Sequence, residues 1–105
     1  MKIKICGITE IETLNFLIEN GVDYVGFIFH ENSPRNVTHA FINEIKNIDF
    51  QKTRPVCVFV NPEKSFVNSS LSYFENPIIQ FHGDESEDFC KLFKIYQSNS
   101  NNEFF

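Results

Sequence analysis

The chain has 105 residues, enough for one domain with a single core, and its composition excludes several classes of protein. A hydrophobic content of 42% and a charged content of 22% are typical of globular proteins and argue against wholesale disorder. The net charge of −5 argues against nucleic acid or an anionic membrane as a partner, because both require clustered Lys and Arg. No apolar run is long enough to span a bilayer, and the first residues predict a strand rather than a signal peptide.

The first predicted strand, residues 2–6, ends at a cysteine. Ile3 and Ile5 lie on one face of this strand, and Lys4 and Cys6 lie on the other. The thiol is then at the carboxyl end of a strand, where parallel α/β folds bind ligands, and the lysine could favour the thiolate. An isolated free cysteine is more commonly a small buried hydrophobe, and these residues alone leave that alternative open.

The predicted helices begin at recognisable caps. Thr9 and Glu12 have the spacing of a capping box that opens the first helix. Thr38 is expected to cap the second helix, and Asn61, with Pro62 at the first helical position, the third. Short apolar runs between these helices predict strands that begin near residues 23, 55 and 78, in addition to the first.

The strands and helices alternate, which implies parallel strands with right-handed crossovers. Four such units fit either a small doubly wound sheet or half of a (β/α)8 barrel. A doubly wound sheet is covered by helices on both faces, so its strands should be apolar on both. The fourth predicted strand instead places Ile79 and Phe81 on one face and Gln80 and His82 on the other, as the first strand does with its own polar pair. We therefore expect an α/β fold of four βα units with parallel strands, half of a (β/α)8 TIM barrel.

This half-barrel is expected to span residues 1–96. A complete barrel typically has about 250 residues, so four units leave two bare strand edges that would have to be paired. Self-association and a separate, complementary C-terminal half are the two ways of covering them. Residues 97–105, rich in Ser and Asn, are expected to form a loose tail or the truncated start of a fifth unit.

The four strand ends place reactive and polar side chains on one rim: Cys6, the 30–35 loop with Arg35, Asn61 and His82. A cysteine base or nucleophile, an arginine for an anionic group and a polar histidine are the components of an enzyme site. Taken singly, each of these residues is weak evidence for such a site. His82, for example, could simply hydrogen-bond backbone groups at a strand end.

Other titratable residues are given structural roles. The three cysteines, Cys6, Cys57 and Cys90, form no C-x-x-C pair, so we expect reduced thiols and a cytoplasmic location rather than disulfides or zinc. Cys57 and Cys90 are expected in the core, and His39 on the solvated surface. After the fourth strand, we expect a helix that is capped by Ser86. The acidic residues Glu85, Glu87 and Asp88 lie at its start, where the helix dipole favours negative charge, and we do not expect them to bind a metal.

Four motifs, taken together, are much more specific. They are KICGIT at 4–9, VGFIF at 25–29 leading to SPRNV at 33–37, VFVN at 58–61, and QFHGDES at 80–86. Their order and spacing resemble the phosphoribosylanthranilate isomerase family of tryptophan biosynthesis, from residue 2 to about residue 96. The resemblance implies a (β/α)8 barrel that converts N-(5-phosphoribosyl)anthranilate into the corresponding aminoketose by an Amadori rearrangement, without a metal or organic cofactor.

The resemblance also implies roles for three residues. Cys6 matches the general base that removes the proton from the sugar C2 after ring opening. Arg35, in the Ser-Pro-Arg motif, would pair with the anthranilate carboxylate, because a planar guanidinium suits a planar anion. His82, in the His-Gly-Asp motif, would line the same pocket as a supporting residue.

The family's general acid, an aspartate on the fifth strand, and its phosphate-binding loops after strands seven and eight have no counterpart among these motifs. Glu103 matches no catalytic motif. We expect a truncated or split gene product, or a remnant, that lacks the general acid and the phosphate site of the complete enzyme.

Two non-enzymatic readings compete with this one. A receiver-like signalling domain would need an acidic pair after the first strand and an aspartate ending the third, where this chain has Cys6–Gly7 and Asn61–Pro62. An inert, oligomerising fragment is favoured by the open strand edges and the thirteen phenylalanines.

Overall fold

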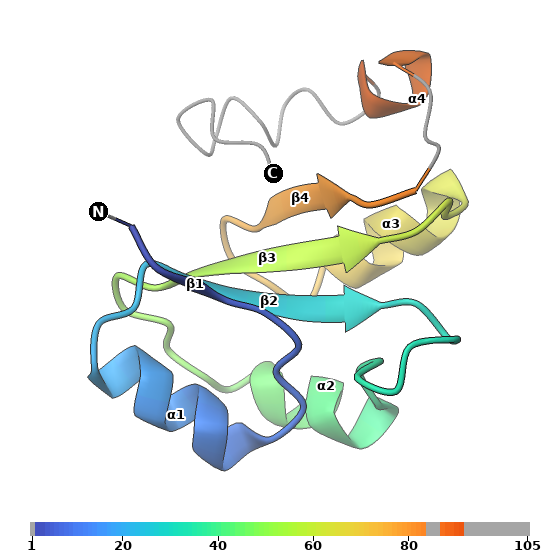
Figure 1. Cartoon of the computed structure of the whole chain (residues 1–105). Coiled ribbons are helices and arrows are strands. Elements are labelled where there is room, and N and C mark those ends of the chain that lie inside the picture. The colour runs from blue at the N-terminus through green and yellow to red at the C-terminus, as the bar shows by residue number, and fades with distance from the viewer. Residues whose placement is uncertain (1, 84–86, 92–105) are drawn as a thin grey trace.

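The computed structural model describes residues 2–83 and 87–91, in which four strands alternate with four helices (Figure 1). The elements in chain order are β1 (Lys4–Ile5), α1 (Ile11–Glu19), β2 (Tyr24–Phe29), α2 (His39–Ile45), β3 (Arg54–Phe59), α3 (Lys64–Leu71), β4 (Ile78–Phe81) and α4 (Glu87–Lys91). The predicted cap Ser86, the neighbouring Glu85, Glu103 and the predicted tail at 97–105 lie outside the described residues.

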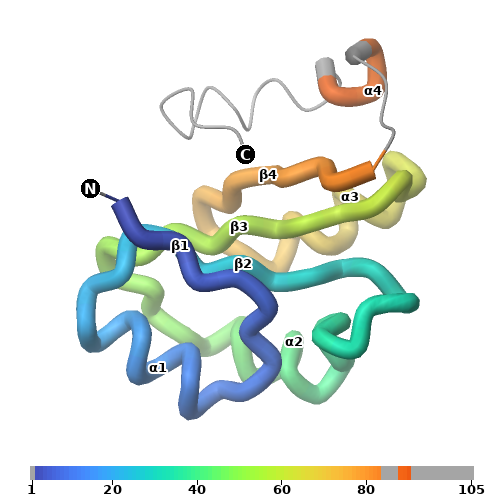
Figure 2. Tube along the Cα trace, in the orientation of Figure 1, coloured from blue at the N-terminus to red at the C-terminus, as the bar shows by residue number. Residues whose placement is uncertain are grey.

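The strands form one parallel sheet in the order β1-β2-β3-β4 (Figures 1 and 2). Sequential order without a reversal is the arrangement of a singly wound barrel, whereas a doubly wound sheet has a switch point at which the order reverses. The described part of the chain is therefore not a receiver-like domain. Two edges of this sheet, β1 and β4, have no neighbouring strand among the described residues.

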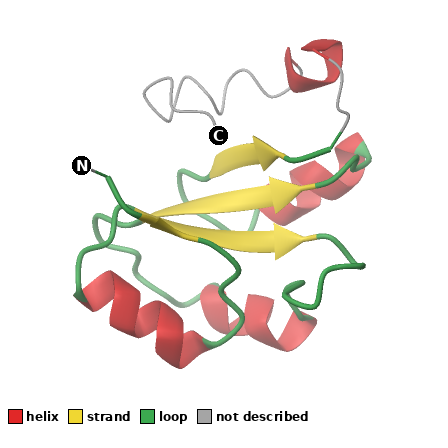
Figure 3. Cartoon of the chain, viewed as in Figure 1, coloured by secondary structure: helices red, strands yellow, loops and turns green. Residues whose placement is uncertain are grey.

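One face of the sheet carries the helices and nearly all of the core (Figure 3). Phe27, Phe29 and Phe59 project from β2 and β3 into this core, and Phe74 joins them from the α3–β4 connection. The ring centroids of Phe27 and Phe74 lie 5.3 Å apart, and those of Phe29 and Phe59 lie 5.4 Å apart, both in stacked geometry. The high phenylalanine content thus serves in large part to fill the layer between sheet and helices.

The opposite face is only partly apolar and is concave. Tyr24, Val56, Val58 and Ile78 form a small cluster there, against which Cys6 and Ile28 pack. Lys4 Nζ on β1 donates a hydrogen bond to Gln80 Oε1 on β4 across this face. In a flat sheet these edge strands would be three spacings, about 14 Å, apart, and two side chains that stand roughly perpendicular to the sheet would not meet. The sheet is therefore strongly curved, and the whole arrangement is half of a (β/α)8 barrel, as the sequence predicts.

The expected division of the faces is confirmed in β1 and β4, but the apolar side chains of β1 are more exposed than those of β4. Ile79 and Phe81 face the helix-covered core, and Gln80 faces the concave side. Ile5 pairs with the fully buried Val25 and so points to the helix side, yet it is 38% exposed, and Ile3 is 50% exposed. No described helix covers these two side chains, because β1 is the edge strand of the sheet.

Of the three predicted side-chain caps that lie within the described residues, only one is correct. Thr38 is the N-cap of α2, and its Oγ1 accepts a hydrogen bond from Phe41 N–H at 3.1 Å. The N-cap of α1 is Glu10 rather than Thr9, and no side chain caps it. Ile8 N–H donates to Gly26 O at 3.1 Å, so the chain is still bonded to β2 at residue 8 and enters the helix later than the capping box predicts.

The predicted start of α3 is also wrong. Its N-cap is Glu63 rather than Asn61, again without a side-chain cap. Asn61 has a φ of +44°, in the left-handed region, whereas an N-cap residue is normally extended. The Asn61–Pro62 pair therefore forms a turn at the end of β3 rather than the first residues of the helix.

The helices of the described residues are short. None of them, within 2–83 and 87–91, has the length and apolar character needed to cross a membrane.

Candidate active site

Two glycines place the Cys6 thiol at the carboxyl end of β1. Gly7 has a φ of +79°, and its N–H donates to Gly26 O at 3.0 Å, which turns the chain sharply after the strand. A Cβ at Gly26 would lie 2.8 Å from Cys6 Sγ, so the thiol packs directly on the bare backbone of β2. The half-buried thiol therefore lies on the concave face, not in the helix-side core.

The loop after β2 is folded back on its own strand. Val37 N–H donates to Ile28 O at 2.9 Å, and Asn36 N–H donates to Ser33 O at 3.1 Å. Ser33 Oγ accepts from the backbone N–H of Arg35 at 3.1 Å, which is a local turn typical of serine. The Ser-Pro-Arg segment is thus held in one backbone conformation at the end of β2.

This loop brings Arg35 to Gly7. A Cβ at Gly7 would lie 2.5 Å from Arg35 Nη1 and 2.8 Å from both Cδ and Cζ, so the guanidinium group lies over the glycine. Gly7 directly follows Cys6, so the ends of the first two strands place an exposed cationic group against the residue next to the thiol. Gly7 and Arg35, 28 positions apart in the sequence, meet here, as the predicted rim requires.

His82 stands at the end of β4. Its backbone N–H donates to Phe59 O at 2.8 Å, which continues the β3–β4 ladder by one residue. Its ring Nδ1 lies 3.4 Å from Gln80 Nε2, and Gln80 Oε1 accepts from Lys4 Nζ. The exposed imidazole is therefore connected to β1, the strand that carries Cys6, through two side chains.

Asn61, on the same rim, packs against the loop that follows His82. A Cβ at Gly83 would lie 2.8 Å from Asn61 Oδ1 and 3.0 Å from Asn61 N. The left-handed turn of Asn61 and the absence of a side chain at residue 83 together allow the ends of β3 and β4 to approach closely.

The bridge from Lys4 to Gln80 was missed by sequence reasoning. The alternation of faces does assign both side chains to the inward side, but it gives no sign that the two edge strands approach each other. Among the described residues, no three His, Cys, Asp or Glu side chains lie together in a way that could hold a metal ion.

The other predicted positions are largely as expected. Cys57 is fully buried on the helix side of β3, and burial raises the pKa of its thiol. His39 is exposed at the start of α2. Cys90, expected in the core, is only half-buried, and none of the three cysteines is in a disulfide.

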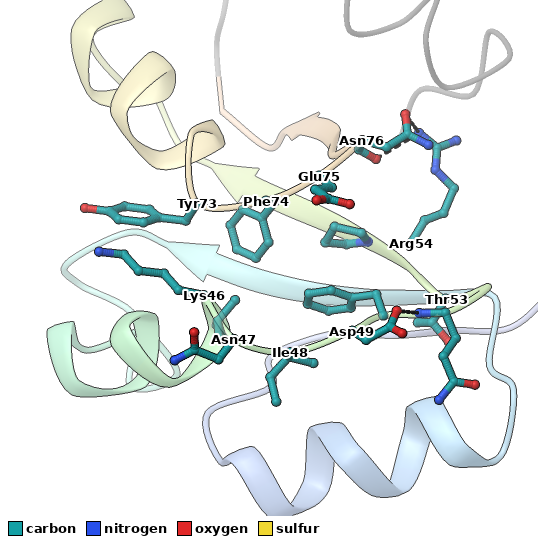
Figure 4. Close-up of a pocket in the computed structure, with 14 residues that line it drawn as sticks. Lys46, Asn47, Ile48, Asp49, Thr53, Arg54, Tyr73, Phe74, Glu75 and Asn76 are labelled. Atoms are coloured by element: carbon teal, nitrogen blue, oxygen red, sulfur yellow. Dashed lines mark hydrogen bonds between the residues drawn. The ribbon is translucent and has the colours of Figure 1, made fainter.

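A cavity of about 530 Å³ lies at the other end of the strands and does not include this rim (Figure 4). The α2–β3 and α3–β4 connections line it. Lys46 Nζ lies 5.0 Å above the ring of Tyr73 at one side, and Arg54 Nη2 donates to Asn76 O and Oδ1, both at 3.1 Å, at the other. Because its lining includes neither Cys6 nor any other residue of the rim, we assign this cavity to the packing of the connections and not to the candidate site.

Comparison with known proteins agrees with this geometry. The chain is 40% identical over 93 residues to the N-(5'-phosphoribosyl)anthranilate isomerase of Legionella pneumophila (strain Paris), which covers 89% of this chain and 45% of the relative. It is 38% identical over 95 residues to the enzyme of that name from Nitrosomonas eutropha, covering 90% of this chain and 46% of the relative. The chain therefore spans about half the length of the curated relatives that it matches.

Solved structures give the same result. The phosphoribosyl anthranilate isomerase of Thermotoga maritima superposes with a TM-score of 0.80 at 33% identity, over 90% of this chain and 46% of that one. A phosphoribosyl anthranilate isomerase in complex with reduced 1-(o-carboxyphenylamino)-1-deoxyribulose 5-phosphate also gives a TM-score of 0.80 at 33% identity, over 90% and 49%. Residues 3–101 match the family model described as N-(5'-phosphoribosyl)anthranilate (PRA) isomerase. Four parallel βα units, a matching family model and these relatives together show that the chain belongs to the phosphoribosylanthranilate isomerase family.

Proposed function

We propose that this chain supplies the base and the anthranilate-binding side of a phosphoribosylanthranilate isomerase site. Cys6 is the general base, Arg35 binds the substrate carboxylate, and His82 supports the substrate from the end of β4. The observation that carries this proposal is the contact of the Arg35 guanidinium with Gly7, the residue that follows the half-buried Cys6 on the concave face.

The chemistry suits these groups. Once the sugar ring of the aminoaldose has opened, the thiolate of Cys6 takes the proton from C2, and the resulting enol form collapses to the aminoketose. A bidentate guanidinium–carboxylate pair holds the anthranilate ring in one orientation, so that C2 is presented to the sulfur. The solved relative with a bound reduced carboxyphenylaminodeoxyribulose phosphate supports this class of ligand.

The acid that opens the ring and the phosphate-binding loops belong, by family resemblance, to the fifth, seventh and eighth strands. We propose that four further βα units complete the ring at the edges of β1 and β4. A second copy of this chain could cover the same edges, but it would duplicate Cys6 and would supply no such acid. We therefore assign activity to the pairing with complementary units and not to a symmetric dimer.

Genetic complementation tests both the proposed role of Cys6 and the need for complementary βα units. An auxotroph that lacks the isomerase is transformed with this chain alone and with this chain together with the second half of the Legionella relative. Rescue is expected in the second case. Cys6→Ser in the paired system should abolish rescue, and Cys90→Ser, a thiol exchange in α4, should leave it intact. Failure of the unaltered pair to rescue, with both polypeptides present in soluble form, would refute the proposed activity.

We also propose a cytoplasmic location. Its support is that Cys6, Cys57 and Cys90 form no disulfide, which suits a reducing compartment.

A further inference from the structure

A polar bridge crosses the concave face above the inner apolar cluster and ends at the histidine of the candidate site. Lys4 Nζ on β1 donates to Gln80 Oε1 on β4, and Gln80 Nε2 lies 3.4 Å from His82 Nδ1. Gln80 and Lys4 are both half-buried. The bridge therefore joins the two edge strands of the sheet and terminates on a ring nitrogen.

The chemistry of the three groups fixes the direction of each hydrogen bond. A lysine ammonium group only donates, so the end of the Gln80 amide that faces Lys4 is the oxygen. The other end of the amide, the NH2 group, then faces His82 and can only donate. His82 Nδ1 must therefore accept, which requires that it carry no proton, and a neutral imidazole then bears its proton on Nε2.

We propose that Lys4 and Gln80 are positioning residues that hold His82 in the neutral Nε2–H form, so that it presents a hydrogen-bond donor at the mouth of the site. The role of that donor rests on the proposed function: it would bind an oxygen of the substrate on the side of the site opposite Arg35. We assign neither positioning residue a part in the chemical step. They act by fixing which ring nitrogen is protonated and how the ring is oriented.

The bridge is directional, and that gives it a distinctive test. In Gln80→Glu the side chain keeps its shape and its contact with Lys4, but its second oxygen can only accept a hydrogen bond. His82 Nδ1 must then donate, so the proton moves to the other ring nitrogen. A residue that only filled space would not reverse the tautomer in this way.

The tautomer is read from the imidazole 15N chemical shifts of the 105-residue chain, at a pH above the usual histidine pKa of about 6.5. The unaltered chain should show His82 protonated at Nε2, and Gln80→Glu should show it protonated at Nδ1. His30 and His39, the only other histidines, are internal controls whose shifts should not change. Identical His82 shifts in the two proteins would overturn the proposal, as would an Nδ1-protonated ring in the unaltered chain.

Lys4 provides a second, independent variant. Lys4→Met removes the donor that fixes the amide direction, so His82 should show a mixture of the two tautomers. Lys4→Arg retains a donor to Gln80 Oε1 and should restore the single form. If Lys4→Met leaves the His82 shifts unchanged, the lysine has no part in the positioning.

Activity is measured separately in the complemented enzyme. Loss of one well-placed hydrogen bond in the complex corresponds to about tenfold in kcat/KM, and we expect a loss of this size in Gln80→Glu. If Gln80→Glu reverses the His82 tautomer but Cys6→Ser retains activity, the proposed function is wrong and the positioning role of the bridge is supported. If Cys6→Ser is inactive but Gln80→Glu changes neither the tautomer nor kcat/KM, the positioning role is wrong and the proposed function is supported.

Discussion

Two positions without side chains build the rim of the candidate site. Gly26 lets the Cys6 sulfur lie on the backbone of β2, and Gly7 lets the Arg35 guanidinium lie over the end of β1. At both positions a single methyl group would occupy the place of a functional atom. The two glycines thus determine where the thiol and the cation are.

Gly7→Ala and Gly21→Ala form a matched pair, because both glycines have positive φ values, of 79° and 68°. Each alanine should lower the free energy of unfolding by about 1–2 kcal/mol, the cost of a side chain in the left-handed region. A Cβ at Gly21 meets nothing within 4 Å, whereas one at Gly7 would displace Arg35.

We therefore expect similar losses of stability in urea titrations, but a loss of substrate affinity in the complemented enzyme for Gly7→Ala only. An equal effect of the two substitutions on KM would contradict the placement of Arg35.

Burial of Cys57 makes stability depend on pH in the alkaline range. Burial raises the pKa of this thiol in the folded chain, whereas in the unfolded chain the thiol ionises near pH 8.5. Above about pH 8.5 the unfolded state therefore loses a proton that the folded state keeps, and stability falls as pH rises, by up to about 1.4 kcal/mol per pH unit.

Urea titrations of the unaltered chain and of Cys57→Ala across this range isolate the contribution, because the other groups that titrate are common to both. The alanine variant should show the shallower decline. Parallel slopes would mean that the Cys57 thiol ionises equally well in both states.

Helices α1, α2 and α3 differ in how their first turns are capped. Thr38 closes the first turn of α2 through its hydroxyl, whereas α1 and α3 begin at glutamates whose side chains make no cap. The loop before α1 instead forms backbone hydrogen bonds with β2, and the loop before α3 contains the left-handed turn at Asn61.

Thr38→Ala should therefore lower the free energy of unfolding by about 1 kcal/mol, the usual cost of losing a side-chain cap. Thr9→Ala is the control, because Thr9 has the capping-box spacing but is not a cap; its effect should stay within about 0.5 kcal/mol. Chemical denaturation of both variants compares them directly. A larger loss for Thr9→Ala would show that the sequence pattern, rather than the described cap, stabilises α1.

At the scale of the whole molecule, the curved sheet has two edges and one of them is apolar. Ile3 and Ile5 are 50% and 38% exposed at β1, the end of the sheet farthest in strand order from β4. An uncovered apolar edge strand is a template for pairing with another chain.

We expect the chain to self-associate through this edge when no complementary units are present. The double variant Ile3→Lys, Ile5→Lys should shift the sedimentation profile toward monomer, because charge on an edge strand opposes pairing. Phe16→Lys is the matched control, since Phe16 is 63% exposed on α1, away from the edge. If the Phe16 variant alone dissociates the oligomers, the contact surface is the helix and not the β1 edge.

The four βα units, the polar face of β4 and the rim residues could be predicted from the chain, because they follow from local periodicity and from the rule that parallel strands end on one side. The family could be predicted from four motifs in order. Only the folded molecule shows where α1 and α3 begin, that Ile3 and Ile5 are exposed, and that Lys4 and Gln80 meet across the concave face. These features depend on sheet curvature and on bonds between residues far apart in the chain, such as Ile8 with Gly26, and no local pattern of side chains encodes them.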